Sequence, residues 1–301
     1  MVCYSPLRGY RGRAVDPRTG RRPVVFNLRD GFEDRPVELP CGQCIGCRLE
    51  RSRQWAVRCV HEAQMHERNC FVTLTYDDEH LPEDRSVDVR EFQRFMKRLR
   101  KRYGRGIRFF HCGEYGEVNE RPHYHALLFN HDFEDRELWS VRSDVRLYVS
   151  RELQSVWPFG WSTLGDVTFN SAAYVARYVL KKVTGQGAQE RYQWTHPETG
   201  EVHERRPEYV TMSRRPGIGA AWVDRFRSDL YPSDFVVLNG AKMRLPRYYD
   251  QRLELDEKDA RTIRGTRIVS AKRHVEDQTP DRRQVRKRVQ EARLKLLPRE
   301  L

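Results

Sequence analysis

The sequence predicts an α+β fold in which helices cover a central antiparallel sheet. The first observation behind this prediction is a hairpin pattern, in which apolar runs at 107–112 and 121–129 are joined by a short polar turn. The second is the order of patterns from residue 71 to residue 182, which is strand, helix, hairpin, helix, strand and helix. A chain of 301 residues is long enough to bury a complete core of this kind.

Residues 1–76 contain the N-terminal elements of the predicted fold. Residues 1–40 are irregular and rich in Arg, Pro and Gly, with one short strand expected at 24–28. A helix is predicted over 49–68 and a strand over 71–76. The alternation of this strand gives it two faces, one with Val72, Leu74 and Tyr76 and the other with Phe71, Thr73 and Thr75.

A second helix should begin after Asp88 as its N-cap and end near Tyr103. One side of this helix is apolar and the other is basic. A solvated basic face is the first interpretation, and contact with a DNA backbone is the second. After the hairpin, residues 134–157 predict mostly helix with a break around 141–148, and residues 159–169 predict a strand.

Further short helices and strands are predicted in the C-terminal half. A helix is predicted over 171–182, a hairpin over 192–202, a strand over 209–213 and a helix over 220–230. From Asp250 onward charged residues dominate, and we expect loose helices there. A basic tail of this kind adds nonspecific affinity for DNA.

The net charge and the cysteine content limit the partners and the cellular locations that the sequence allows. A net charge of +13 favours a polyanionic partner, with nucleic acid first and an anionic membrane surface second. No apolar run is long enough for a membrane span, and the N-terminus lacks a signal-peptide core, so we expect no membrane partner and a cytoplasmic location. The odd number of cysteines, seven, argues against a disulfide framework.

Two histidines lie one residue apart at the start of the apolar run 121–129. Strand alternation points His123 and His125 to the same face. With the hairpin turn centred near residues 118–119, Glu114 lies across from His123 on the neighbouring strand. Two imidazoles and a carboxylate then converge on one point.

A slip of one residue in the hairpin would turn Glu114 to the other face and bring Glu117 or Tyr115 into its place. With Glu114 in place, the donors are two nitrogens and an oxygen, a set that suits Mn²⁺ or Mg²⁺. A pair of half-exposed histidines without a ligand is the alternative interpretation.

The helix predicted over 171–182 carries two tyrosines. Tyr174 and Tyr178 are four residues apart and Lys181 follows three residues later, so all three share one helical face. This stripe is either an amphipathic surface or a pair of nucleophiles beside a phosphate-binding cation.

Near the N-terminus, three cysteines recur at every third position: Cys41, Cys44 and Cys47. The glycines between them favour turns that let the three thiols face one centre. Structural zinc takes four ligands, for which Cys3 is the natural fourth and Cys59 or Cys70 are alternatives. An iron–sulfur cluster and three reduced thiols in a loop are the other interpretations.

Taken together, the paired histidines, the upstream glutamate and the two-tyrosine helix resemble the HUH endonucleases of rolling-circle replication. Within that group the sequence resembles the replication initiators of gokushoviruses, phages of the Microviridae. The resemblance covers roughly residues 1–225. The motifs that carry it are Glu114, His123-Tyr124-His125, Tyr174 with Tyr178 and Lys181, and the segments 71–77, 41–48 and 216–219.

The resemblance implies an HUH endonuclease fold for residues 56–230, with an antiparallel sheet flanked by helices. A cysteine-rich segment with a zinc site, residues 1–55, would precede it and pack on the core. A basic helical extension, residues 231–301, would follow. The resemblance also implies an enzyme that nicks single-stranded DNA at a phage origin and religates it in the cytoplasm of the bacterial host. A host helicase and DNA polymerase would be its partners.

In that reaction Tyr178 would attack the phosphate, form a 5′-phosphotyrosine link and release a free 3′-OH. Tyr174 would make the second cut, and the two tyrosines would exchange roles in alternate cycles. Lys181, with Lys182 as the alternate, would steady the phosphate or lower the pKa of the phenol. The paired histidines and Glu114 would hold the catalytic Mn²⁺ or Mg²⁺.

The sequence leaves two alternatives to this function. One is a plasmid, relaxase or transposase-type HUH nuclease, which uses the same chemistry on a different DNA. The other is a noncatalytic DNA-binding protein that zinc stabilises.

Overall fold

A computed structural model of the chain describes residues 3–116, 119–142, 145–177, 188–196, 199–253 and 257–296. The chain divides into two compact units. One unit consists of Met1–Arg51 together with Arg264–Glu300, and the other consists of Ser52–Ile263. The division of the sequence at residues 55 and 230 stays a prediction.

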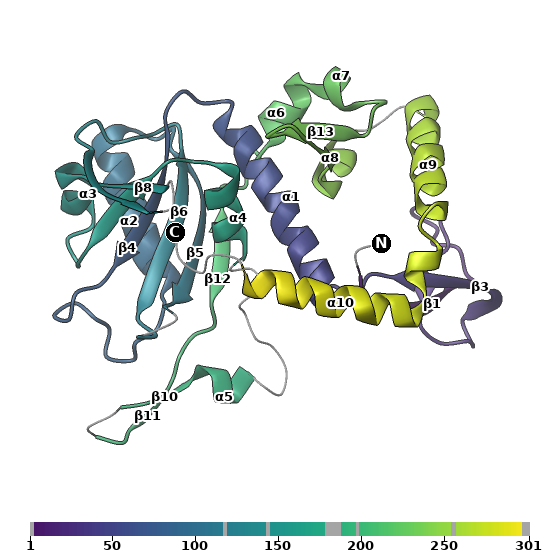
Figure 1. Cartoon of the computed structure of the whole chain (residues 1–301), viewed down its shortest axis with the longest axis horizontal. Helices are drawn as coiled ribbons and strands as arrows, with labels where there is room; N and C mark the ends of the chain where they lie inside the picture. The colour runs from purple at the N-terminus through teal and green to yellow at the C-terminus, as the bar shows by residue number, and fades with distance from the viewer. Residues whose placement is uncertain are drawn as a thin grey trace. The chain divides into compact units, whose positions relative to one another are not determined.

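The larger unit is built on an antiparallel sheet (Figure 1). Within the described ranges this sheet has seven strands in the order β12-β5-β6-β4-β9-β8-β7, and each neighbouring pair is antiparallel. Its strands are β4 (Asn69–Thr75), β5 (Arg108–Tyr115), β6 (Pro122–Phe129), β7 (Glu137–Arg142), β8 (Val145–Val149), β9 (Ser162–Gly165) and β12 (Tyr209–Met212).

Helices cover both faces of this sheet, which confirms the predicted α+β class (Figure 1). α2 (Val89–Tyr103) and α3 (Arg151–Val156) pack on the face that carries Tyr124, which we call the Tyr124 face. α4 (Phe169–Arg177) and the later half of α1 (Ile45–Ala63) pack on the opposite face. Because His123 and His125 flank Tyr124 in β6, we call this opposite face the imidazole face.

The predicted alternation of the strand over 71–76 is confirmed. Val72, Leu74 and Tyr76 belong to the core of the Tyr124 face, whereas Phe71 belongs to the core of the imidazole face. The strand pairs with β6 on one side and with β9 on the other. It therefore connects the histidine strand to the far half of the sheet.

The helix α2 forms as its sequence predicts. Asp88 is the N-cap, and its carboxylate accepts a hydrogen bond of 2.8 Å from the backbone N–H of Arg90. Its last turn is basic, which complements the negative end of the helix dipole. The residues that it buries on the Tyr124 face are Phe92, Phe95, Met96 and Leu99.

The mostly helical expectation for residues 134–157 is wrong. Most of this segment is the hairpin of β7 and β8, and only α3, Arg151–Val156, is helical. β8 pairs with β9 through Tyr148 and Leu164, so the hairpin extends the sheet. This pairing is nonlocal, and it outweighs the weak helical pattern of the segment.

The predicted strand over 159–169 is confirmed as the shorter β9, and the strand over 209–213 is confirmed as β12. The predicted helix over 220–230 is broken at Phe226 into α6 and α7. The other elements of this unit are α5 (Ala188–Tyr192), β10 (Gln193–Thr195), β11 (Val202–Glu204), α6 (Ala220–Arg225), α7 (Arg227–Leu230), β13 (Phe235–Leu238), β14 (Ala241–Arg244), α8 (Arg247–Arg252) and the start of α9 (Glu257–Lys272).

The smaller unit contains the cysteine-rich segment and the C-terminal helices. Its sheet has the order β2-β1-β3 among the described residues, with β1 at Leu7–Gly12, β2 at Val24–Val25 and β3 at Gly31–Leu39. A short η2 (Glu276–Gln278) leads into α10 (Pro280–Lys295). The guanidinium of Arg283 in α10 donates two hydrogen bonds to the carboxylate of Glu38 in β3, which ties the C-terminal helix to the N-terminal sheet.

None of the helices in the described ranges combines the length and the apolar composition that a membrane span requires.

Tyr124 anchors the histidine strand from the Tyr124 face. Its side chain is fully buried, and its hydroxyl oxygen accepts a hydrogen bond of 2.9 Å from the backbone N–H of Asp88. The hydroxyl of Tyr76 lies 3.2 Å away. The residue between the two histidines thus joins β6 to the start of α2 and to the end of β4.

We predict that Tyr124→Phe lowers the free energy of unfolding by about 1–3 kcal/mol, because it leaves the buried Asp88 N–H without its acceptor. Tyr209→Phe is the matched control, since the buried hydroxyl of Tyr209 has no partner among the described residues. The control should leave stability unchanged or raise it. Urea unfolding of both variants measures the difference, and equal losses would contradict the anchoring role.

Candidate metal and nucleophile site

The hairpin of β5 and β6 has the register that the sequence predicts. Glu114 lies directly opposite His123, and Cys112 lies opposite His125. Directly opposed residues in an antiparallel pair point to the same face, so these four side chains lie together on the imidazole face. Glu114 therefore supplies the carboxylate beside the histidines, and Tyr115 points to the other face. Glu117, the other alternative, lies outside the described residues.

His125 is held at both ring nitrogens. Its Nε2 lies 3.1 Å from Oε1 of Glu114, and its Nδ1 lies 3.0 Å from Oγ1 of Thr73. The His125 and Glu114 side chains are 7% and 5% exposed, so water competes little for these contacts. Thr73 is opposite His125 in the β4–β6 ladder, and this contact fixes the plane of the ring.

The spacing of His125 and Glu114 fits a shared ion. Two ligand atoms at adjacent corners of an octahedron around Mg²⁺ are about 3 Å apart, because each bond is about 2.1 Å long. The observed separation of 3.1 Å has this value. The two atoms, which form a hydrogen bond here, thus have the spacing of neighbouring metal ligands.

His123 has an unused donor atom. Its Nδ1 is buried and has no hydrogen-bond partner among the residues that the structure describes. Burial, and then the nearby His125, lowers the pKa of His123 to about 4. The ring is therefore neutral at neutral pH, which is the form that binds a metal ion.

The ring of His123 is not yet in a ligating position. It stacks on the ring of His125, with centroids 6.2 Å apart and planes 10° apart. In the described part of the chain, only the four cysteines Cys3, Cys41, Cys44 and Cys47 bring three or more candidate ligand atoms within 4.8 Å of one another. A shared ion therefore requires the His123 ring to turn toward Glu114.

Gly116 leaves space beside this ring. A Cβ atom built at Gly116 would lie 2.9 Å from Cε1 and 3.3 Å from Nδ1 of His123. The unpartnered buried nitrogen, the space beside it and the adjacent carboxylate together fit a divalent cation of the Mn²⁺ or Mg²⁺ class. The sequence does not reveal the role of Gly116 or the contact of Thr73 with His125. Strand alternation does place Thr73 on the same face as Phe71 and Thr75, which is the imidazole face.

The structure brings Tyr174 to this site. Its ring meets the ring of His125 edge to face, with centroids 5.2 Å apart and planes 88° apart. The Tyr174 side chain also contacts Phe71, and the guanidinium carbon of Arg177 lies 5.6 Å from its ring centroid. Tyr174 thus lies on the imidazole face beside the histidine pair. Tyr178, Lys181 and Lys182 lie outside the described residues.

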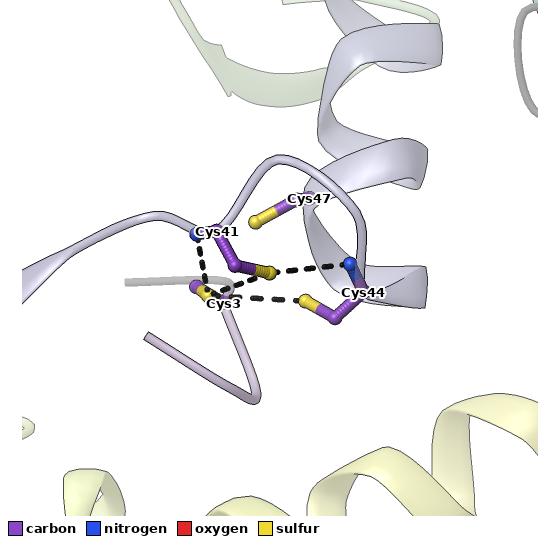
Figure 2. A group of neighbouring side chains, drawn as sticks. All are labelled: Cys3, Cys41, Cys44 and Cys47. Carbon is purple, nitrogen blue, oxygen red and sulfur yellow. Dashed lines mark hydrogen bonds between the residues drawn. The ribbon is translucent and has the colours of Figure 1, made fainter. Parts of the chain in front are cut away.

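A second cluster, of four thiols, lies in the smaller unit. Figure 2 shows the side chains of Cys3, Cys41, Cys44 and Cys47 converging on one point, with Cys3 supplied by the N-terminal segment. Sγ of Cys3 lies 3.6 Å from Sγ of Cys41 and 3.8 Å from Sγ of Cys44. The structure therefore brings together the four cysteines that the sequence analysis grouped, and among the described residues they alone form such a cluster of candidate ligands.

The thiols have unequal acidity. Burial favours the neutral thiol, but hydrogen bonds from the backbone N–H groups of Tyr4 and Cys47 outweigh it and lower the pKa of Cys44 to about 6. Burial raises the pKa of Cys3. Cys59 and Cys70, the alternative fourth ligands, are buried in the cores on the two faces of the large sheet and not in this cluster.

Comparison with known proteins identifies relatives of this chain. The family model of the ORF2-type replication-associated proteins matches residues 69–183, which contain the histidine pair and both tyrosines. The chain is 33% identical over 260 residues to the replication-associated protein VP4 of Bdellovibrio phage phiMH2K, an alignment that covers 83% of this chain and 76% of the relative.

Two further relatives come from other phages. The chain is 34% identical to the replication-associated protein ORF2 of Spiroplasma virus 4, over 73% of this chain and 69% of that protein. It is also 34% identical to the replication-associated protein ORF4 of Chlamydia phage 1, over 70% of this chain and 52% of that protein. All three phages belong to the Microviridae. No solved structure matches the chain.

We expect the protein to bind Mn²⁺ and the variant His123→Ala to bind it at least about tenfold more weakly, because a nitrogen ligand is lost. Glu114→Gln should weaken binding as well, since the amide keeps the shape of the side chain but removes its charge. Isothermal titration calorimetry measures both effects. Mn²⁺ suits this site better than the soft thiolates of the cysteine cluster.

The matched control for this titration is His80→Ala, which removes an exposed histidine that pairs with Asp77. Its Mn²⁺ affinity should equal that of the unmodified protein. A His123→Ala variant that binds Mn²⁺ as tightly as the control would show that this ring is not a ligand.

Proposed function

The chain belongs to the ORF2-type family of phage replication-associated proteins, and on this basis we propose that it is a replication initiator endonuclease with an HUH fold. It nicks single-stranded DNA at the phage origin through a 5′-phosphotyrosine intermediate and later religates it. The observation that carries the proposal is the convergence of Glu114, His125 and Tyr174 on one face of the sheet, with His123 beside them.

In this reaction the phenolate oxygen of a tyrosine attacks the phosphorus atom of the scissile phosphodiester. The bond from phosphorus to the 3′-oxygen breaks, that oxygen takes up a proton, and a free 3′-OH leaves. The 5′-phosphate remains on the tyrosine. Attack by a 3′-OH reverses the step, so religation needs no ATP because the phosphotyrosine link conserves the bond energy.

The two tyrosines divide this work. Tyr178 makes the first cut and Tyr174 makes the second, and they exchange roles in alternate rounds. Lys181, or Lys182 in its place, holds the phosphate and favours the phenolate. Because the phenol of a free tyrosine has a pKa near 10, a neighbouring cation is needed to raise the phenolate fraction at neutral pH.

The imidazole face orients the phosphate. His123, His125 and Glu114 would hold Mn²⁺ or Mg²⁺, which when bound polarises the phosphate and offsets its charge. Thr73 keeps the His125 ring in one plane, so its Nε2 stays directed at Glu114. The burial of the His125 and Glu114 side chains limits the competition of water for their ligand atoms.

The cellular setting follows from this role. The protein acts in the cytoplasm of the bacterial host, on single-stranded origin DNA. A host DNA polymerase extends the 3′-OH, and a host helicase separates the strands. The net charge of +13 supports DNA as the partner, because phosphate contacts by Lys and Arg supply most nonspecific affinity.

The four thiols of the smaller unit form a structural zinc site in this proposal. Four sulfur ligands are the usual set for structural zinc, and all four ligand atoms lie within 4.8 Å of one another. Cys44 immediately precedes α1 and Cys47 lies in its first turn, so zinc would fix the N-terminal end of this helix to the segment that carries Cys3. The site has a structural role and no part in cleavage.

We predict that the Tyr174→Phe and Tyr178→Phe variants each still cut labelled single-stranded origin DNA once in Mn²⁺. Each should form its covalent adduct on the remaining tyrosine. The double variant should bind DNA normally but form no adduct, because no phenol remains to attack. Denaturing gels measure cleavage, and mass spectrometry maps the modified tyrosine.

Tyr148→Phe is the control for these variants, since Tyr148 lies on the Tyr124 face in β8 and should not affect cleavage. Adduct formation by the double variant would refute the tyrosine mechanism. Loss of all cleavage in both single variants would refute the exchange of roles but would leave the nucleophile assignment in place.

We predict that the purified protein contains about one equivalent of zinc and that Cys44→Ser lowers this content and the stability of the smaller unit. Cys70→Ala should keep its zinc, because Cys70 lies in the core of the larger unit. Inductively coupled plasma mass spectrometry measures the metal. Iron with a visible absorption band in place of zinc would instead identify an iron–sulfur cluster.

A further inference from the structure

Two tryptophans are exposed at the far half of the sheet. Trp139 of β7 is 60% exposed, and Trp161, just before β9, is 49% exposed. Their rings contact each other, with centroids 5.0 Å apart and planes 61° apart. Large aromatic side chains exposed side by side are informative, because they usually mark a binding surface.

The register of the sheet places Trp161 in line with the histidines. Leu74 of β4 pairs with Ser162 of β9, and the backbone N–H of Thr75 donates a hydrogen bond of 2.9 Å to the carbonyl of Trp161. Thr75 in turn lies opposite His123. Glu114, His123, Thr75 and Trp161 therefore form one row across four neighbouring strands.

Trp161 points to the imidazole face. The neighbouring residue, Ser162, is buried and donates a hydrogen bond of 3.0 Å to Gln154 of α3, which packs on the Tyr124 face. Successive side chains of a strand alternate, so Trp161 has the opposite orientation. Neighbouring strands are about 4.8 Å apart, which places the backbone of Trp161 about 10 Å from that of His123.

Trp139 joins this face through an irregularity in β7. The pairing of β7 with β8 shifts between Leu138 and Ser140, so Trp139 is the extra residue of a β-bulge. Leu138 pairs with Tyr148, which packs on the Tyr124 face. The contact of the Trp139 ring with that of Trp161 places Trp139 on the imidazole face, opposite to Leu138.

We propose that Trp139 and Trp161 are a stacking platform for bases of the single-stranded DNA whose phosphate lies at the histidine pair. This inference rests on the proposed function. Bases of an unpaired strand stack on exposed aromatic side chains whatever their sequence. Because Trp161 continues the row of Glu114 and His123 and contacts Trp139, a strand that follows this row meets both rings. The chain's net positive charge attracts the phosphates of that strand.

The experiment measures binding of a fluorescein-labelled oligothymidylate to the full-length protein by fluorescence anisotropy. We expect Trp139→Ala and Trp161→Ala each to weaken binding by roughly tenfold, as for the loss of one stacked base. Trp161→Phe should restore most of the affinity. A matched oligomer of the same length that lacks bases should bind the unmodified protein and the Trp161→Ala variant equally.

Leu138→Ala and Val141→Ala are matched controls, because both side chains are similarly exposed on the same strand, at 59% and 57%. They should leave DNA affinity unchanged. Unchanged affinity in both tryptophan variants would overturn the platform. An equal loss of affinity for the oligothymidylate and for the oligomer that lacks bases would also overturn the platform, since that loss would not come from stacking.

Two further outcomes separate this inference from other possibilities. If the tryptophan variants change the oligomeric state in analytical ultracentrifugation but not DNA affinity, the pair is a contact between copies of the chain and the platform is refuted. If the unmodified protein binds and cuts single-stranded DNA but the tryptophan variants do so equally well, only this inference fails. If the unmodified protein neither binds nor cuts, the proposed function fails with it.

Discussion

The register of β5 against β6 is the constraint on which the rest of the site depends. A shift of one residue would turn Glu114 away from the histidines and leave two imidazoles without an acidic neighbour. The apolar side chains that alternate with the site residues prevent this shift, because they would have to move from the core to the other face. The same ladder continues through β4, which adds Thr73 to the site and fixes the ring of His125.

The two faces of β6 have different structural roles. On one face the imidazoles lie next to Glu114 and Tyr174, and Thr73 and Glu114 hold the ring of His125. On the other face Tyr124 is fully buried and bonded to the start of α2. The buried face of the strand thus holds the side chains of the other face in position, which is the support that a reactive site requires.

Much of this arrangement could be predicted from the sequence, because the relevant signals are local. The short turn between two apolar runs predicted the pairing of Glu114 with His123. Helical spacing predicted only that Tyr174 shares a face with Tyr178 and Lys181, and the packing of α4 on the sheet brings Tyr174 to the histidines. Asp88 likewise indicated the start of α2, because an N-cap residue directly precedes the helical pattern that it caps. These features depend on residues that are close in sequence or on a single periodic pattern.

The features that were missed depend on nonlocal pairing. Residues 134–157 have a pattern compatible with helix, and only the free edge of β9 makes most of them a hairpin. The contact of Thr73 with His125 needs the register of β4 against β6, which lie 52 residues apart in the chain at this contact. Trp161 likewise acquires its place only when β9 pairs with β4.

The position of the four thiols in the chain bears on how the protein is made. All of them lie within the first 47 residues, ahead of every strand of the large sheet. The complete ligand set is therefore translated well before the last strand of the large sheet, β12 (Tyr209–Met212). Metal capture by these thiols can then precede the folding of the larger unit, and the N-terminal segment can be ordered while synthesis continues.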